Sequence, residues 1–199
     1  MGRTYGYIQS KLTGNEKVYS APENVKLFDT YDLRPSLDPI RDQGDVSKCV
    51  SCALTDMVRY KMSIGVYKDS QFDDAIFYDT RPDPTTEGMQ PIDAFNYLVN
   101  TGVNGQKGEM FAMVRSAEMA KHAIVANGPV MACLLAKSYE TDFWNGWYIL
   151  GGHATLLVGY NNDGFILRNS WGKSYGKNGY SIFPYKKFNT GLEYWTLIS

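Results

Sequence analysis

The chain has 199 residues with 44% hydrophobic content, which is enough for one domain, or two small lobes, with a core that needs no disulfides. Its formal charge of −1, from 20 Lys and Arg against 21 Asp and Glu, excludes a strongly basic surface, so we expect no nucleic-acid partner. No run reaches the roughly 18 apolar residues of a membrane helix, and the first residues lack the apolar core of a signal peptide, so we also expect no membrane partner.

The N-terminal part of the chain divides into an arm and a buried helix. Residues 1–26 are polar, with scattered Gly, Lys and Asn and no helical period, and they predict an extended arm or strand. From residue 50 to 62, apolar residues recur at helical spacing. A buried helix is therefore predicted from Cys49, or just before it, to Gly65.

Two further helices are bounded by their start and stop residues. The second has Pro91 at a first-turn position and ends at Gly102. The third begins at the candidate cap Ser116 and ends at residues 127–129, an Asn-Gly-Pro stop.

Short apolar or alternating runs then predict a series of β-strands. These runs are Val130–Ala136, Ala154–Tyr160, Phe165–Asn169, Tyr180–Phe183 and Tyr194–Ile198. Residues 161–164 (NNDG) have the composition of a hairpin turn. Helices followed by antiparallel strands indicate an α+β protein with two lobes.

Two histidines are available for catalysis. His122 stands beside Lys121 on the third predicted helix, and we interpret it as a surface residue. His153 follows residues 151–152, both glycine, and precedes an apolar strand. At the mouth of a strand, glycines let another backbone or a substrate approach closely, so His153 is the stronger candidate.

Cys49 is the candidate nucleophile. It lies at a predicted helix N-terminus beside Lys48, and both features favour a thiolate. From these features alone, a buried inert cysteine is an equally good interpretation.

Three blocks of sequence together resemble the papain-like cysteine peptidases, the C1 papain family. Residues 43–49 (QGDVSKC) are similar to its Gln-Gly-x-x-Gly-Ser-Cys segment. Residues 152–160 resemble its histidine strand, and residues 168–180 resemble its Asn-Ser-Trp-Gly motif and the tail that follows. The resemblance runs from about Leu27 to the C-terminus and is greatest to the bacterial and viral branch, which lacks the usual disulfides.

The resemblance implies a papain-like fold with an active-site cleft between two lobes. The catalytic domain would be 27–199, with a helical lobe at about 45–115. An antiparallel β-barrel-like lobe would take in about 116–199 and an N-terminal strand. Only 42 residues precede Gln43, so we expect 1–26 to be an arm or a short pro-like segment.

The resemblance also implies catalytic roles. Cys49 would be the nucleophile, His153 the general base and then acid, and Asn169 the residue that orients the imidazole ring. Gln43 and the Cys49 backbone amide would donate hydrogen bonds to the oxyanion. Trp171 would shield the bond between His153 and Asn169 from water.

Four further residues are expected to bind substrate. Gly88 resembles the glycine on which the family pairs the substrate backbone by strand addition. Met89 and Cys133 would line the neighbouring apolar pocket, and Gly152 would leave room for the substrate. The expected substrate is a peptide or protein, with no cofactor and no metal.

Other interpretations of the cysteines remain open. Cys52 could be the nucleophile if the motif held a two-residue insertion, but the reading without a gap keeps the glutamine spacing. The Cys49-x-x-Cys52 pattern is also typical of thiol–disulfide exchange. A zinc site would need Cys133 and His153 as well.

The natural reaction also stays open. Two departures, Ser47 for glycine and Val50 for tryptophan, leave the catalytic atoms but alter their surroundings. A thioester can pass its acyl group to an amine as well as to water, so an acyltransferase or narrow isopeptidase is an alternative. A catalytically silent papain-like binding module is another.

The cysteine count suggests the compartment. Three cysteines are too few for a secreted disulfide framework, so we expect the cytoplasm or another reducing compartment. We also expect a monomer. If the chain is viral, it could be virion-associated.

Overall fold

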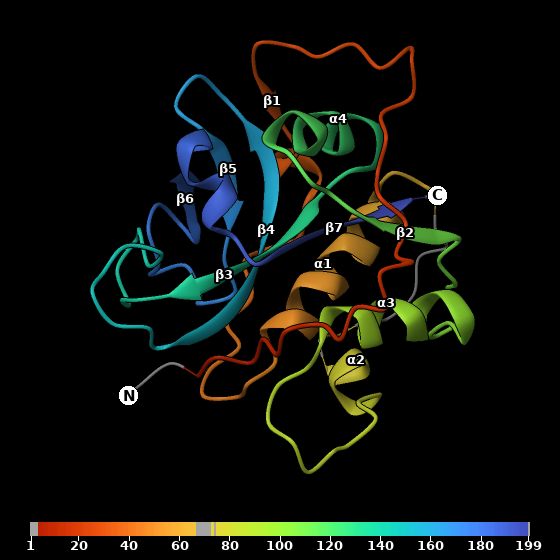
Figure 1. Cartoon of the computed structure of the whole chain (residues 1–199), viewed down its shortest axis with the longest axis vertical. Coiled ribbons are helices and arrows are strands. Elements are labelled where there is room, and N and C mark those ends of the chain that lie inside the picture. The colour runs from red at the N-terminus through yellow and green to blue at the C-terminus, as the bar shows by residue number, and fades with distance from the viewer. Residues whose placement is uncertain (1–3, 67–72, 74, 199) are drawn as a thin grey trace.

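Seven antiparallel strands form one sheet in a computed structural model that describes residues 4–66, 73 and 75–198. The strand order is β2-β7-β3-β4-β5-β6, and β1 pairs with β4 (Figure 1). The strands are β1 (Tyr31–Asp32), β2 (Met110–Met113), β3 (Val130–Ala136), β4 (Gly151–Tyr160), β5 (Phe165–Arg168), β6 (Tyr180–Phe183) and β7 (Glu193–Ile198). The long strand β4 pairs with three neighbours and therefore occupies the middle of the sheet.

The helices pack on this sheet. They are α1 (Cys49–Ser63), α2 (Ala75–Asp79), α3 (Pro91–Asn100) and α4 (Ala117–Asn127), with short 3₁₀ turns at Arg34–Ser36 and Tyr185–Thr190. Helix α1 is buried between the sheet and the other helices, because it contacts β3 and β4 as well as α2 and α3. Figure 1 shows α1, α2 and α3 gathered on one side and β3 to β6 on the other, which gives an α+β fold. No helix in the described residues is long and apolar enough to cross a bilayer.

The predicted helix boundaries are confirmed by their caps. The Ser116 hydroxyl accepts a hydrogen bond from the Met119 backbone amide at 3.1 Å, so it caps α4 as expected. Gly102 ends α3 with a φ of +80°, a conformation that glycine adopts without strain. Between β4 and β5, the Asn161 side chain accepts hydrogen bonds from the Asp163 and Gly164 amides and forms the predicted turn.

The N-terminal strand that the resemblance implied is β1, which pairs with β4. Strand β2 and helix α2 were not predicted. Strand β2 comes from the range assigned to the helical lobe, yet it pairs with β7 along its whole length. Its partner strand lies more than eighty residues further along the chain, so no local sequence pattern indicates this pairing. Strand β4 also begins earlier than predicted, so His153 is its third residue and does not lie at its mouth.

Candidate active site

Cys49 is the first residue of α1, and its side chain is completely buried. Its sulfur accepts a hydrogen bond from the Ala154 backbone amide of β4 at 3.4 Å, so the helix N-terminus lies against the middle of the sheet. Burial raises the pKa of the Cys49 thiol to about 11, although backbone amides, including those of Ala154 and Gly6, act in the opposite direction. The backbone amides of Cys49 and Val50 at the helix N-terminus lower this pKa, as expected, but in the covered state the loss of solvent outweighs them.

His153 lies one residue before Ala154 and is held by Asn169. The His153 Nε2 atom and the Asn169 Oδ1 atom are 2.8 Å apart. An amide oxygen only accepts, so Nε2 carries the hydrogen and Nδ1 is the nitrogen that can exchange a proton. The Ser170 backbone amide donates to the same Oδ1 at 2.8 Å, which fixes the orientation of the Asn169 side chain.

Aromatic side chains enclose the His153 ring. Trp171 stacks on it with a centroid distance of 4.5 Å and an interplanar angle of 24°, and both residues are completely buried. Phe143 meets the ring edge-on at 5.4 Å, and Tyr5 does so at 6.2 Å. The sequence motif placed Trp171 at this position, whereas Phe143 and Tyr5 lie in segments without a motif.

Gln43 lies beside this group and is tied to it through Ser170. The Ser170 hydroxyl donates to Gln43 Oε1 at 2.7 Å, and the Gln43 backbone amide donates to the Ser170 carbonyl at 2.9 Å. The side-chain Nε2 donates to the Val46 carbonyl at 3.0 Å and to the Thr4 carbonyl at 3.3 Å. A carbonyl of the N-terminal arm thus uses the donor that was predicted to serve an oxyanion.

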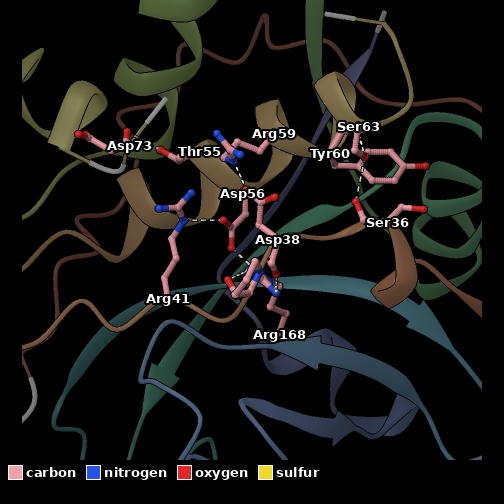
Figure 2. A network of polar contacts seen from close by, with 11 residues as sticks. Ser36, Asp38, Arg41, Thr55, Asp56, Arg59, Tyr60, Ser63, Asp73 and Arg168 are labelled. Atoms are coloured by element: carbon pink, nitrogen blue, oxygen red, sulfur yellow. Dashed lines mark hydrogen bonds and ion pairs between the residues drawn. The ribbon is translucent and has the colours of Figure 1, made fainter. Parts of the chain in front are cut away.

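A buried ionic network joins the segments that carry these side chains (Figure 2). Arg168, next to Asn169, donates to Asp56 of α1 at 2.7 Å, and Arg41 donates to the other oxygen of Asp56 at 2.6 Å. Arg168 also donates to the carbonyls of Asp38 and Pro39 at 2.9 and 3.0 Å. One guanidinium group therefore connects the end of β5, helix α1 and the segment that leads to Gln43.

The N-terminal arm runs past the N-terminal end of α1 and continues toward α3 (Figure 1). Its backbone pairs in parallel with Met89: the Met89 amide donates to the Gly6 carbonyl at 2.8 Å, and the Ile8 amide donates to the Met89 carbonyl at 3.0 Å. On the other side, the Tyr7 amide donates to the Gly152 carbonyl at 3.1 Å. Residues 4–8 therefore fill the space between Met89 and β4, directly over Cys49.

Three glycines make this close approach possible. Gly88 has a φ of +87°, and a Cβ there would come within 2.7 Å of the Gly6 carbonyl oxygen. A Cβ at Gly152 would overlap the Tyr7 ring, and a Cβ at Gly6 would overlap the Ser47 carbonyl. The structure thus places the predicted substrate-binding residues Gly88, Met89 and Gly152 around the arm.

Cys133 also lies close to the arm. It lies on β3 opposite Glu193 of β7, and it is close enough to Tyr7 to contribute to the raised pKa of that phenol. Burial raises the pKa of Cys133 above its usual range, with a further contribution from Glu193. Glu193 belongs to no motif and precedes the predicted strand Tyr194–Ile198, so no local signal in the sequence marks it.

Cys49, Cys52 and Cys133 are all buried, and none of them forms a disulfide with another. Across the described ranges, no three His, Cys, Asp or Glu side chains are grouped closely enough to hold a metal ion.

Known proteins that are similar in sequence to this chain are cysteine proteases of the papain family or proteins described as similar to them. Residues 104–194 match the family model described as papain family cysteine protease. An uncharacterised peptidase C1-like protein of Acanthamoeba polyphaga mimivirus is 38% identical over 68 residues, which is 32% of this chain and 20% of that protein. Papain from Carica papaya is 20% identical over 204 residues, which is 87% of this chain and 59% of papain.

Solved structures show the same fold. Xylellain, a cysteine protease from Xylella fastidiosa, superposes with a TM-score of 0.84 at 18% identity, over 98% of this chain and 96% of that one. The procathepsin B S9 from Trypanosoma congolense has a TM-score of 0.78 at 17% identity, over 98% and 87% of the two chains. Among the sequence relatives, the match spans a fifth of the mimivirus protein and about three-fifths of mouse cathepsin 7 and of papain.

Proposed function

This chain is a papain-like protein, related by fold and sequence to the papain family of cysteine proteases, and we propose that it hydrolyses peptide bonds through Cys49, His153 and Asn169. The observation that supports this most directly is the 2.8 Å hydrogen bond between His153 and Asn169. His153 lies on β4, and the next residue of that strand, Ala154, binds the Cys49 sulfur through its backbone amide. A silent binding module has no use for this combination. The proposed substrate is a peptide or protein.

In the proposed reaction, His153 Nδ1 takes the proton of the Cys49 thiol, and the sulfur attacks the carbonyl carbon of the scissile bond. The resulting oxyanion accepts hydrogen bonds from the Gln43 side chain and the Cys49 backbone amide. His153 then protonates the leaving amine, and the C–N bond breaks to give a thioester. Water, deprotonated by His153, attacks the thioester and releases the acid and the thiol.

Asn169 and Trp171 would support the imidazole in this cycle. The Asn169 oxygen holds the ring with its Nε2 hydrogen in place, which leaves Nδ1 as the nitrogen that exchanges a proton in each step. Trp171 covers the ring face and keeps water from the hydrogen bond, which strengthens that bond in the low-dielectric interior.

We assign residues 1–26 to an inhibitory arm and 27–199 to the catalytic domain. With the arm in place, Cys49 is buried as a neutral thiol, and the side-chain amide of Gln43 donates to the Thr4 carbonyl. The Gly6 carbonyl is held by the Met89 amide, and the Gly6 amide binds the Cys49 sulfur, so a donor faces the nucleophile. The arm must therefore leave before a substrate can bind.

Peptide cleavage by a chain with a displaced arm tests this function. A Gly6→Ala chain should cleave members of a random peptide library, as followed by mass spectrometry of the products. The additional change Cys49→Ala should abolish cleavage, whereas Cys52→Ser should retain it. Products joined to an added amine in place of water would identify an acyltransferase, and a folded chain that cleaves nothing would refute the hydrolase.

A further inference from the structure

Tyr7 of the arm fills a pocket that ends in a carboxylate. Its ring lies against Gly152, its hydroxyl donates to Glu193 Oε1 at 2.6 Å, and Cys133 is close enough to affect the phenol's pKa. Its backbone pairs with that of Met89. Tyr7 and Glu193 are both buried, although 186 positions separate them in the sequence. The Tyr7 side chain therefore reaches from Gly152 on β4 to a buried carboxyl group on β7.

The Glu193 side chain depends on the arm for two of its three hydrogen bonds. Its Oε1 atom accepts from the Tyr7 hydroxyl and from the Ser10 amide, the latter at 2.7 Å. Its Oε2 atom accepts from the Trp195 indole at 2.8 Å. None of the ion pairs found among the described residues includes Glu193. Once the arm leaves, Oε1 loses both donors, and the next occupant must replace them or bury a carboxylate oxygen without a donor.

We propose that Glu193 determines specificity by selecting peptides that place a tyrosine side chain in the pocket now filled by Tyr7. This rests on the proposed function, because it assumes that a substrate adds to the backbone of Met89 where the arm adds now. The arm then resembles the preferred substrate in its side chain.

The pocket favours tyrosine over other large residues for two reasons. The absence of a side chain at Gly152 leaves room for an aromatic ring, and the 2.6 Å bond places the donor at the ring's far end. Phenylalanine would fill the same space but leave the carboxylate without a donor, and leucine would not reach it. Sites built to bind a hydroxyl reject analogues that lack it far more strongly than they reject changes in apolar bulk.

The test is a binding comparison that needs no catalysis. A full chain carrying Gly6→Ala and Cys49→Ser is titrated by calorimetry with hexapeptides that contain one tyrosine at each position in turn, and with matched phenylalanine peptides. A hydrogen bond to a charged group contributes enough to affinity that one position should favour tyrosine by about 10- to 150-fold. Equal affinities for tyrosine and phenylalanine at every position would overturn the proposal.

The Glu193→Gln substitution completes a double-mutant cycle. It keeps the shape and an acceptor but removes the charge, so the tyrosine preference should fall by about threefold or more while phenylalanine peptides bind as before. A preference unchanged by Glu193→Gln would overturn the role of the carboxylate. If Glu193→Gln does not fold, the comparison of tyrosine with phenylalanine peptides still tests the proposal, because it changes the peptide and leaves the protein intact.

The two proposals can fail separately. If the Gly6→Ala chain cleaves tyrosine and phenylalanine peptides with equal kcat/KM, the hydrolase is supported and the specificity of Glu193 is overturned. Tyrosine-selective binding without cleavage would support the pocket and overturn the hydrolase.

Discussion

The fit of the arm at Gly6 leads to a quantitative prediction. A Cβ added at Gly6 would overlap the carbonyl of Ser47, which is two residues from Cys49 at the start of α1. The Ser47 backbone cannot retreat without moving the helix, so in Gly6→Ala the arm must give way. Overpacking of this kind costs about 1–3 kcal/mol, which would raise the population of chains with an open site by roughly 5- to 150-fold.

Alkylation of Cys49 by iodoacetamide measures this opening. The thiol is completely buried beneath the arm, so the reagent reaches it only in open molecules. At pH 7 the rate for Gly6→Ala should exceed that of the unsubstituted chain by about 5- to 150-fold, as measured by mass spectrometry of the peptide that contains Cys49. The control Asn15→Ala changes an exposed arm residue and should leave the rate unchanged.

Equal alkylation rates for Gly6→Ala and the unsubstituted chain would refute the reasoning, provided that circular dichroism shows both to be folded. That result would mean that something other than the arm closes the site.

Three other outcomes follow from the geometry. The pKa of Cys49, followed by NMR of labelled cysteine, should lie at about 11 and should fall in Gly6→Ala. Because the pKa of the covered thiol exceeds the ordinary value of 9.0, loss of the thiol proton favours the open site. Closure of the arm should therefore weaken as pH rises from about 9 to 11. Arg168→Met should lower the free energy of unfolding in urea by about 3–5 kcal/mol, because it leaves the Asp56 carboxylate buried with only Arg41; a loss below 1 kcal/mol would contradict this. In the Gly6→Ala background, His153→Ala should reduce peptide turnover at least about 10²-fold, whereas His122→Ala, on α4 beside Glu118, should not; equal effects would argue against His153 as the base.

The sequence was most informative where contiguous residues determine the structure. The helix caps at Ser116 and Gly102 act through bonds to residues three to five positions away, so they could be predicted directly. The block around Asn169 and Trp171 has a fixed spacing, and both side chains contact His153 as the resemblance implied.

Long-range contacts account for what the sequence analysis missed. Glu193 and Tyr7 lie at opposite ends of the chain, and neither belongs to a motif. The raised pKa of Cys49 likewise has burial as its main cause, and the arm, whose Gly6 amide binds the sulfur, is one of the segments that bury it. Local features such as a helix N-terminus could indicate a reactive thiol but could not show that a distant segment removes its solvent.

Selective labelling of Cys49 tests the central claim most directly. The Gly6→Ala chain is treated with an epoxide-type cysteine inhibitor, and labelling of Cys49, Cys52 and Cys133 is followed by mass spectrometry together with peptide cleavage. We predict that Cys49 is labelled much faster than the other two and that cleavage is lost in proportion. Slow and equal labelling of all three cysteines, or cleavage that survives complete labelling of Cys49, would contradict the account.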